Sequence, residues 1–287
     1  MTIECTPLGN RIGAVVRGVS LKDVPDGETL DTLETLLEEW GALVFPDQEI
    51  TPAEQVAFSR PFGPLEETAR IDARLEGQPE IFVVGNTGKR IVSFAPADGS
   101  DDLEWHADHM HLKVPARASM LYCKETPSVG GETVFACMYS AYDALSPEEQ
   151  AQAESLTALH SVSGLQKYLK TKGEKGAAEG EYASPQQLTV RWPLVRTHPL
   201  TGRKALYVGS KVTIGIEGWD EDRARAYLDD LLARATVPEF RYSHPWKPGD
   251  AVLWDNRRVL HAGTPFDGSL YRREMHRTTI REDQPIL

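Results

Sequence analysis

The sequence predicts a mainly β fold with flanking helices, an α+β protein built around a β-barrel or jelly roll. Short segments rich in β-forming residues recur along the chain, and helix signals lie at the ends of these runs. No glycine-rich phosphate loop supports a nucleotide-binding α/β fold, and no internal repeat is visible.

Four segments carry helix signals. Residues 28–40 place leucines and Trp40 on one face at helical spacing, and Gly41 stops that helix. The segment 51–54 combines a capping box with proline at the first helical position, so a helix begins there and runs to about Ser59. The segment 146–149 repeats this start for a helix to about residue 156. A fourth helix begins near residue 220, with an apolar inner face.

Six segments favour strands, because they are short and rich in β-branched and aromatic residues: 42–45, 81–84, 120–122, 133–136, 205–208 and 252–254. Turns precede two of them, at Gly130-Gly131 and at 248–250. Residues from about 164 to 185 are rich in Lys, Gly, Glu and Ala and have little to bury. We interpret that stretch as a mobile surface segment and a candidate lid.

The composition fits one globular domain. The chain has 287 residues, so we expect a single elaborated domain over 1–287. The net charge of −12 argues against a nucleic-acid binder, which would present a basic face to phosphates. An anionic substrate must therefore be bound by a local basic site.

The cysteine content and the absence of targeting signals favour a cytoplasmic protein. Cys5, Cys123 and Cys137 show no paired spacing, which is typical of reduced thiols. The N-terminus shows no signal peptide, and no apolar run is long enough for a membrane span.

Residues 104–108 carry the strongest chemical signal. In an extended chain His106 and Asp108 project from the same face, so both can bind one metal ion and leave one side of it open. His261, which follows the strand at 252–254 and its continuation, is the best third candidate. Two histidines and one carboxylate make the facial triad of non-heme iron(II) oxygenases.

Other interpretations of this segment remain open. An isolated His-x-Asp pattern also fits a surface or hydrogen-bonded core histidine. His109 and His111 offer an alternative local cluster, although in a regular strand they face away from His106 and Asp108. A zinc hydrolase could use the same cluster, but no other residue supplies its general base.

The segment 271–280 resembles a strand with a cationic face. Arg273 and Arg277 share one side of it with Met275. A charged edge strand would explain this pattern without any binding role. Together with the metal candidates, however, the two arginines indicate a site for carboxylates, because the guanidinium fork binds a carboxylate bidentately and stays charged.

At this point the sequence resembles the taurine/2,4-dichlorophenoxyacetate dioxygenase family, and it lies closer to the phenoxyacetate-type members. The resemblance runs from Phe58 to Ile280 through motifs in family order: 58–65, 105–108, 130–135, 192–199, 202–206, 254–257 and 272–277. It implies a double-stranded β-helix and an oxidoreductase. Such an enzyme uses Fe(II), O2 and 2-oxoglutarate as co-substrate, and it releases succinate and CO2.

The resemblance also implies roles for individual residues. Iron(II) would bind to His106, Asp108 and His261, the catalytic and metal-binding set. Arg273 would hold the distal carboxylate of 2-oxoglutarate with the Thr133 hydroxyl. The residues implied for the substrate pocket are Arg277, which would bind the anionic head of the substrate, together with His109 and Asp102. Family members are often dimers or larger, so a homo-oligomer is expected.

Departures from the family pattern narrow the range of expected substrates and reactions. Residues 66–102 lack the histidine expected in taurine enzymes, which disfavours taurine. The presence of Asp108 disfavours a halogenase, in which chloride replaces the carboxylate. An aryloxyalkanoate-like carboxylate is favoured, and a sulfonate stays open. The alternatives are desaturation or cyclisation on the same iron, and a non-catalytic β-barrel that binds a small acid or a metal.

Overall fold

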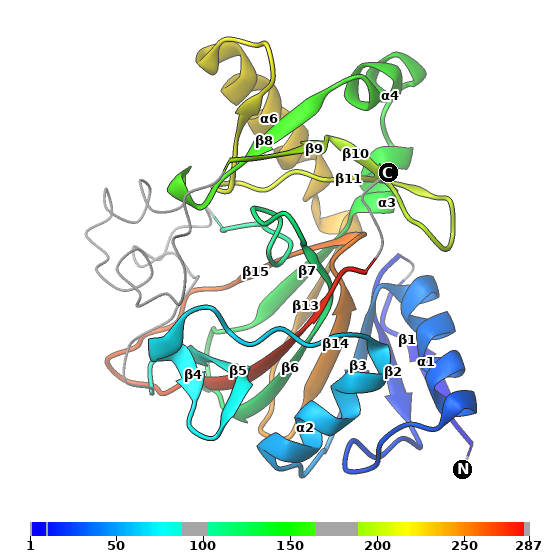
Figure 1. Cartoon of the computed structure of the whole chain (residues 1–287), viewed down its shortest axis with the longest axis vertical. Coiled ribbons are helices and arrows are strands. Elements are labelled where there is room, and N and C mark those ends of the chain that lie inside the picture. Colours follow the sequence, from blue (N-terminus) through cyan, green and yellow to red (C-terminus); the bar gives the residue numbers. More distant parts are fainter. Residues whose placement is uncertain (1, 10, 88–102, 165–188, 284–287) are drawn as a thin grey trace.

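The computed structural model describes residues 2–9, 11–87, 103–164 and 189–283. A large, mostly antiparallel sheet forms one wall of the molecule (Figure 1). Its strands, in hydrogen-bonded order, are β1 (Glu4–Pro7), β2 (Ala14–Arg17), β3 (Ala42–Phe45), β14 (Ala251–Asp255), β6 (Ala116–Glu125), β16 (Glu274–Arg281), β5 (Gln78–Gly85) and β4 (Arg74–Leu75). Only the pairing of β2 with β3 is parallel.

A smaller sheet contributes the opposite side of the cavity described below. Its hydrogen-bonded order is β13 (Arg241–His244), β7 (Thr133–Cys137) and β15 (Val259–Gly263). Beyond β15, His106 forms an isolated antiparallel bridge with His261. The chain before Asp108 is thereby fixed to the outer edge of this sheet.

Helices and short strands surround the two sheets (Figure 1). They are α1 (Gly27–Trp40), α2 (Pro52–Ser59), α3 (Met138–Asp143), α4 (Pro147–Glu154) and α6 (Glu221–Ala235), with 3-10 turns η1 (Arg60–Phe62), η2 (Ile71–Ala73) and η3 (Pro238–Phe240). Strands β8 (Thr157–His160), β9 (Val190–Pro193) and β12 (Thr213–Ile216) form a third sheet, and β10 (Val195–Thr197) pairs with β11 (Lys204–Leu206). This layer lies with α4 and α6 at the end of the molecule opposite α2.

The pleat of β6 separates two hydrophobic cores. Met120 belongs to an outer core that includes Phe58 of α2 and Leu37 of α1. Leu121 belongs to an inner core that includes Phe135 of the smaller sheet. Successive residues of a strand point to opposite faces, so one strand packs against the helices and also lines the interior of the molecule.

The mainly β class with flanking helices is confirmed. Both capping boxes are present, at Thr51 with Glu54 and at Ser146 with Glu149. Gly41 ends α1 in the left-handed region, at φ 72°, as glycine at this position permits. Helix α3, directly after β7, was not anticipated from the sequence.

Residues 104–108 do not form a regular strand. Only His106 pairs with a neighbouring strand, and the chain turns after Asp108, where His109 adopts a positive φ of 57°. The backbone N–H of Leu112 closes this turn on the carbonyl of His109. The predicted mobile segment at 164–185 lies, except for Gly164, outside the described residues. Among the described helices, none is both long and apolar enough to span a bilayer.

We expect Phe58→Ala to lower the free energy of unfolding by about 3–5 kcal/mol, because it leaves a cavity under α2. Phe58 is 1% exposed and packs against Phe45 and Phe62, with ring centroids 6.0 and 5.8 Å away. Leu270, which is 73% exposed, is the control. Leu270→Ala should change stability by less than about 0.5 kcal/mol. Urea denaturation measures both, and equal losses would contradict the assignment of this core.

Candidate active site

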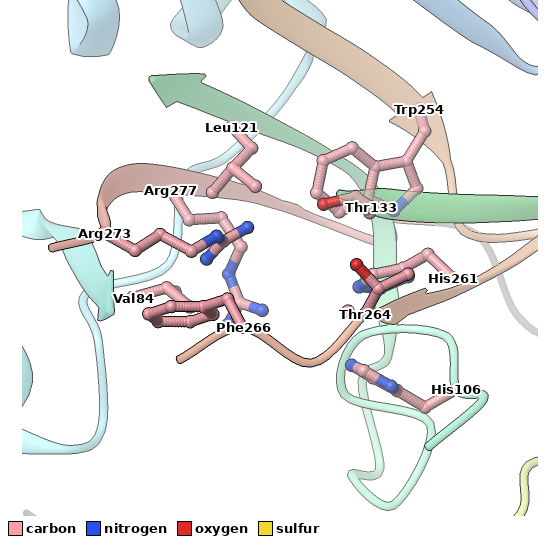
Figure 2. Close-up of a pocket in the computed structure, with 11 residues that line it drawn as sticks. Val84, His106, Leu121, Thr133, Trp254, His261, Thr264, Phe266, Arg273 and Arg277 are labelled. Carbon is pink, nitrogen blue, oxygen red and sulfur yellow. The ribbon is translucent and has the colours of Figure 1, made fainter. Parts of the chain in front are cut away.

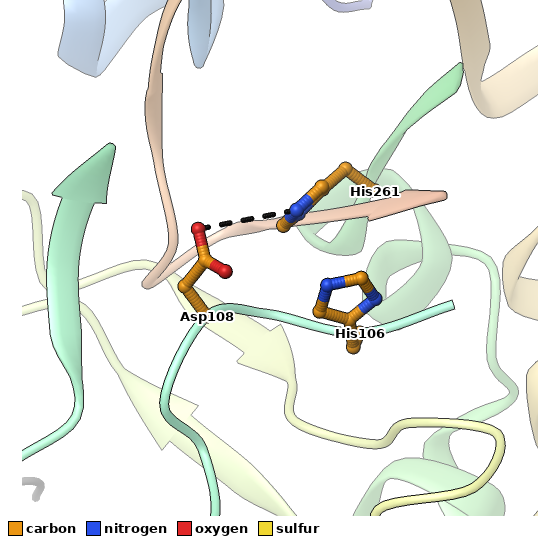
Figure 3. A group of neighbouring side chains, drawn as sticks. All are labelled: His106, Asp108 and His261. Carbon is orange, nitrogen blue, oxygen red and sulfur yellow. Dashed lines mark ion pairs between the residues drawn. The ribbon is translucent and has the colours of Figure 1, made fainter. Parts of the chain in front are cut away.

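Three side chains from two distant segments converge on one point (Figure 3). Ligand atoms of His106, Asp108 and His261 all lie within 4.8 Å of one another. The first two come from the loop before β6, and His261 comes from β15. The structure thus brings together the three residues that the sequence singled out for a metal.

Backbone hydrogen bonds hold the two imidazoles side by side. The N–H of His106 donates to the carbonyl of His261 over 3.0 Å, and the reverse bond measures 2.8 Å. The ring centroids are 4.3 Å apart. The Nδ1 atom of His106 lies 2.7 Å from the carbonyl oxygen of Glu104. A histidine that binds a metal through one ring nitrogen commonly binds a backbone carbonyl with the other in this way.

Asp108 is a buried carboxylate with several polar partners. Its Oδ2 accepts a hydrogen bond from the Ser119 hydroxyl at 2.6 Å, and its Oδ1 accepts one from Nη1 of Arg277. Burial by itself would raise the pKa of Asp108, but Arg277 and the neighbouring imidazoles hold that pKa well below its usual range. Asp108 is therefore a charged carboxylate at neutral pH.

Burial disfavours the charged form of the two histidines as well, and for an imidazole this means a lower pKa. It lowers the pKa of His261 to about 3, assisted by the nearby imidazole of His106. Burial also lowers the pKa of His106, against the raising effect of Asp108. Both rings are neutral at pH 7, and neutral imidazole is the form that binds metals.

A cavity with about 520 Å³ of empty space, its opening to solvent included, adjoins the two histidines. Figure 2 shows Arg273 and Arg277 at one end of it and the imidazoles at the other. The wall also carries apolar side chains, namely Val84, Leu121, Trp254 and Phe266. A small molecule with an acidic group and an apolar body fits this distribution of side chains.

Arg273 is a buried cation that has no carboxylate partner among the described residues. Its Nε donates to the carbonyl oxygen of Gly131 at 3.1 Å, and no ion pair forms. Burial lowers the pKa of Arg273 to about 10, so the guanidinium stays charged at neutral pH. An unpaired buried charge is costly, so this position favours an anionic ligand.

Thr133 lines the same cavity, and its hydroxyl proton is available to a ligand. The indole Nε1–H of Trp246 donates to Thr133 Oγ1 at 3.0 Å. The hydroxyl therefore acts as the acceptor in that bond and keeps its own proton for another acceptor. Gly131 lies two residues earlier at φ 75°, where a Cβ would lie 2.7 Å from Pro127.

Arg277 bonds to Asp108 and also lines the cavity. One Nη is bound to the carboxylate, and the guanidinium carbon lies 4.9 Å from the centre of the Phe82 ring. Its Nε is buried without a hydrogen-bond partner among the described residues. The sequence did not anticipate the bond to Asp108, because the two residues are far apart in the chain.

The two remaining predicted pocket residues are not placed in the cavity. Nδ1 of His109 lies 2.7 Å from Oε2 of Glu66, and His109 is absent from the described cavity wall. Asp102 lies outside the described residues. Sequence reasoning also missed Trp246, Ser119 and Asn256 as site residues. Only Asn256 had a signal, since it lies in the motif at 254–257.

Comparisons with known proteins identify the family of this chain. The model of the family "Taurine catabolism dioxygenase TauD, TfdA family" matches residues 4–279. A (S)-phenoxypropionate/α-ketoglutarate dioxygenase of Sphingobium herbicidovorans is 39% identical, over 92% of this chain and 90% of its own. An α-ketoglutarate-dependent 2,4-dichlorophenoxyacetate dioxygenase of Cupriavidus pinatubonensis is 34% identical over the full length of both.

A solved structure, AAD-2 in complex with Mn(II) and N-oxalylglycine, superimposes with a TM-score of 0.79 at 30% identity, and each chain is covered completely. The match confirms the jelly-roll fold, and the relatives confirm the expected closeness to phenoxyacetate-type members. The chain therefore belongs to the TauD/TfdA family and is an α-ketoglutarate-dependent dioxygenase.

Proposed function

We propose that this chain binds Fe(II) through His106, Asp108 and His261 and hydroxylates a small aryloxyalkanoate-like carboxylate. The observation that carries the proposal is the combination, in one cavity, of a two-histidine, one-carboxylate cluster with two buried arginines. A non-catalytic metal-binding barrel would not need this unpaired cation beside the cluster.

The donor set fits iron(II). Two neutral imidazoles and one charged carboxylate are the protonation states that a divalent metal requires. Three protein ligands on one side leave positions open for a co-substrate and for O2. When bound, the iron would supply the O2 chemistry that couples decarboxylation of 2-oxoglutarate to oxidation of the substrate.

Arg273 and Thr133 would bind the distal carboxylate of 2-oxoglutarate. Arg273 offers a buried, unpaired guanidinium, and Thr133 offers a hydroxyl proton that its bond with Trp246 leaves free. The AAD-2 structure was solved with N-oxalylglycine, a close analogue of 2-oxoglutarate, which supports a dicarboxylate in the corresponding cavity here.

Arg277 would bind the carboxylate of the substrate through the guanidinium edge that Asp108 does not use. Val84, Leu121 and Phe266 would then surround the apolar body. The names of the relatives, which mention phenoxypropionate and dichlorophenoxyacetate, support an aryl ether. Oxygen insertion beside the ether oxygen gives a hemiacetal that releases a phenol and a 2-oxo acid.

The family model spans nearly the whole chain, which supports a single dioxygenase domain over 1–287. A cytoplasmic location, a homo-oligomeric state and a lid at 164–185 stay predictions. Residues Asp102 and His109 stay candidate contacts at the substrate side.

The first prediction of this proposal concerns the metal. Anaerobic addition of Fe(II) and then 2-oxoglutarate to the metal-free protein should produce a weak visible charge-transfer band. His106→Ala should abolish this band, because it removes one of three protein ligands. His111→Ala is the control and should retain it. A band of equal intensity in His106→Ala would refute the proposed ligand set.

The second prediction concerns Arg273. Arg273→Ala should raise the KM for 2-oxoglutarate by about 30-fold or more, because loss of a buried charge partner costs about 2–5 kcal/mol. Arg272→Ala is the matched control, because Arg272 is exposed and its Nε pairs with Glu125. Steady-state kinetics at saturating substrate measure both variants. Equal KM values in the two variants would remove Arg273 from the co-substrate site.

The third prediction concerns the substrate. With Fe(II), 2-oxoglutarate and O2, (S)-2-phenoxypropionate or 2,4-dichlorophenoxyacetate should yield one phenol for each succinate released. Taurine should yield little succinate, because its ammonium group would lie among Val84, Leu121 and Phe266, which offer it no hydrogen-bond acceptor. Succinate release without a phenol would identify another oxidative outcome. Faster turnover of taurine would overturn the substrate class.

A further inference from the structure

Three elements meet at Asp108 through a chain of hydrogen bonds that the site chemistry above does not explain. Oδ1 of Asn256, in the turn after β14, accepts a hydrogen bond from the backbone N–H of Asp108 at 3.0 Å. Its amide nitrogen donates to the hydroxyl of Ser119 on β6, also at 3.0 Å. That hydroxyl in turn lies 2.6 Å from Oδ2 of Asp108.

The two N–H groups that face Asn256 determine the direction of the hydrogen bonds in this series. Oδ1 of Asn256 receives two N–H groups, one from Asp108 and one from the indole of Trp254 at 3.0 Å. The atom that faces two donors must be the oxygen, so the other amide atom is the nitrogen and donates to Ser119. Ser119 consequently accepts from Asn256 and directs its own proton to the carboxylate of Asp108.

Burial isolates these hydrogen bonds from water. Ser119 is fully buried, Asn256 is 1% exposed and Asp108 is 3% exposed. No solvent competes for the hydroxyl proton, so the carboxylate cannot rotate without leaving a buried donor unsatisfied, which is costly. Oδ2 of Asp108 is held in this way 3.9 Å from Nε2 of His261.

We propose that Ser119 and Asn256 are positioning residues that fix the Asp108 carboxylate for metal binding and thereby set the affinity of the triad. This inference rests on the proposed metal centre. Groups that orient metal ligands typically contribute 10–100-fold to affinity. Neither residue lines the described cavity, so neither is expected to contact the substrate.

The test compares two buried serines. Ser119→Ala removes the hydroxyl that binds Asp108. Ser59→Ala removes an equally buried hydroxyl that bonds to Thr278 on the outer side of the same large sheet. Both lose hydrogen bonds in a dry environment, but only the first loses a bond to a candidate ligand. The metal-free proteins are titrated with Mn(II), and free Mn(II) is measured by electron paramagnetic resonance, without co-substrate or turnover.

We expect Ser119→Ala to weaken Mn(II) binding 10–100-fold and Ser59→Ala to stay within about 2-fold of the unsubstituted chain. Ser119→Cys, whose thiol is a weaker donor of similar size, should lie between the two. Urea unfolding of the metal-free variants shows that each is folded before titration. A Mn(II) affinity that falls with the loss of the Ser119 donor, and not with the loss of the Ser59 hydroxyl, indicates positioning of the ligand and not a general loss of structure.

Two results would overturn the inference in different ways. If Ser119→Ala and Ser59→Ala bind Mn(II) as tightly as the unsubstituted chain, the hydrogen-bond chain is structural only, and the metal centre stands. If the unsubstituted chain does not bind Mn(II), or His106→Ala binds it equally well, the metal centre fails and this inference fails with it.

Discussion

The burial of one carboxylate, Asp108, is the constraint on which the rest of the site depends. A charged carboxylate inside a protein needs compensation, and here it comes from the guanidinium of Arg277 and the hydroxyl of Ser119. Asn256 accepts the backbone N–H of Asp108 and donates to Ser119. Arg277 lies on β16, Ser119 on β6 and Asn256 directly after β14, which are adjacent strands of the large sheet. The order of strands in that sheet therefore brings these three side chains to Asp108.

The two sheets supply different side chains to the site. The large sheet supplies Arg277 and Ser119, and Arg273 and Asn256 lie directly beside its strands β16 and β14. The smaller sheet supplies Thr133 and His261, and it holds His106 by a single bridge. The arginines and the imidazoles thus come from different sheets, and α1 and α2 pack against the outer face of the large sheet.

Local signals in the sequence were sufficient for four helices and for much of the large sheet, but not for α3. A capping box is complete within four residues, so Thr51 with Glu54 could be recognised without tertiary information. The turn after Asp108 had no clear local signal, because only His106 in that segment pairs with a strand. The hydrogen bond between Ser119 and Asn256 was not anticipated, because it joins residues 137 positions apart, which no local pattern records. The triad and Arg273 were found through motifs at family-like separations.

The unpaired guanidinium of Arg273 affects the net charge that the ligands of the site must carry. Asp108 and Arg277 offset each other, which leaves Arg273 as a cation without an ion pair among the described residues of the cavity wall. Under the proposed function, a divalent metal and the dianion of 2-oxoglutarate add no net charge, and a monoanionic substrate then brings the complete assembly to zero. A dicarboxylate substrate would leave one negative charge in a largely dry cavity. The proposed function therefore favours acids that carry a single charge.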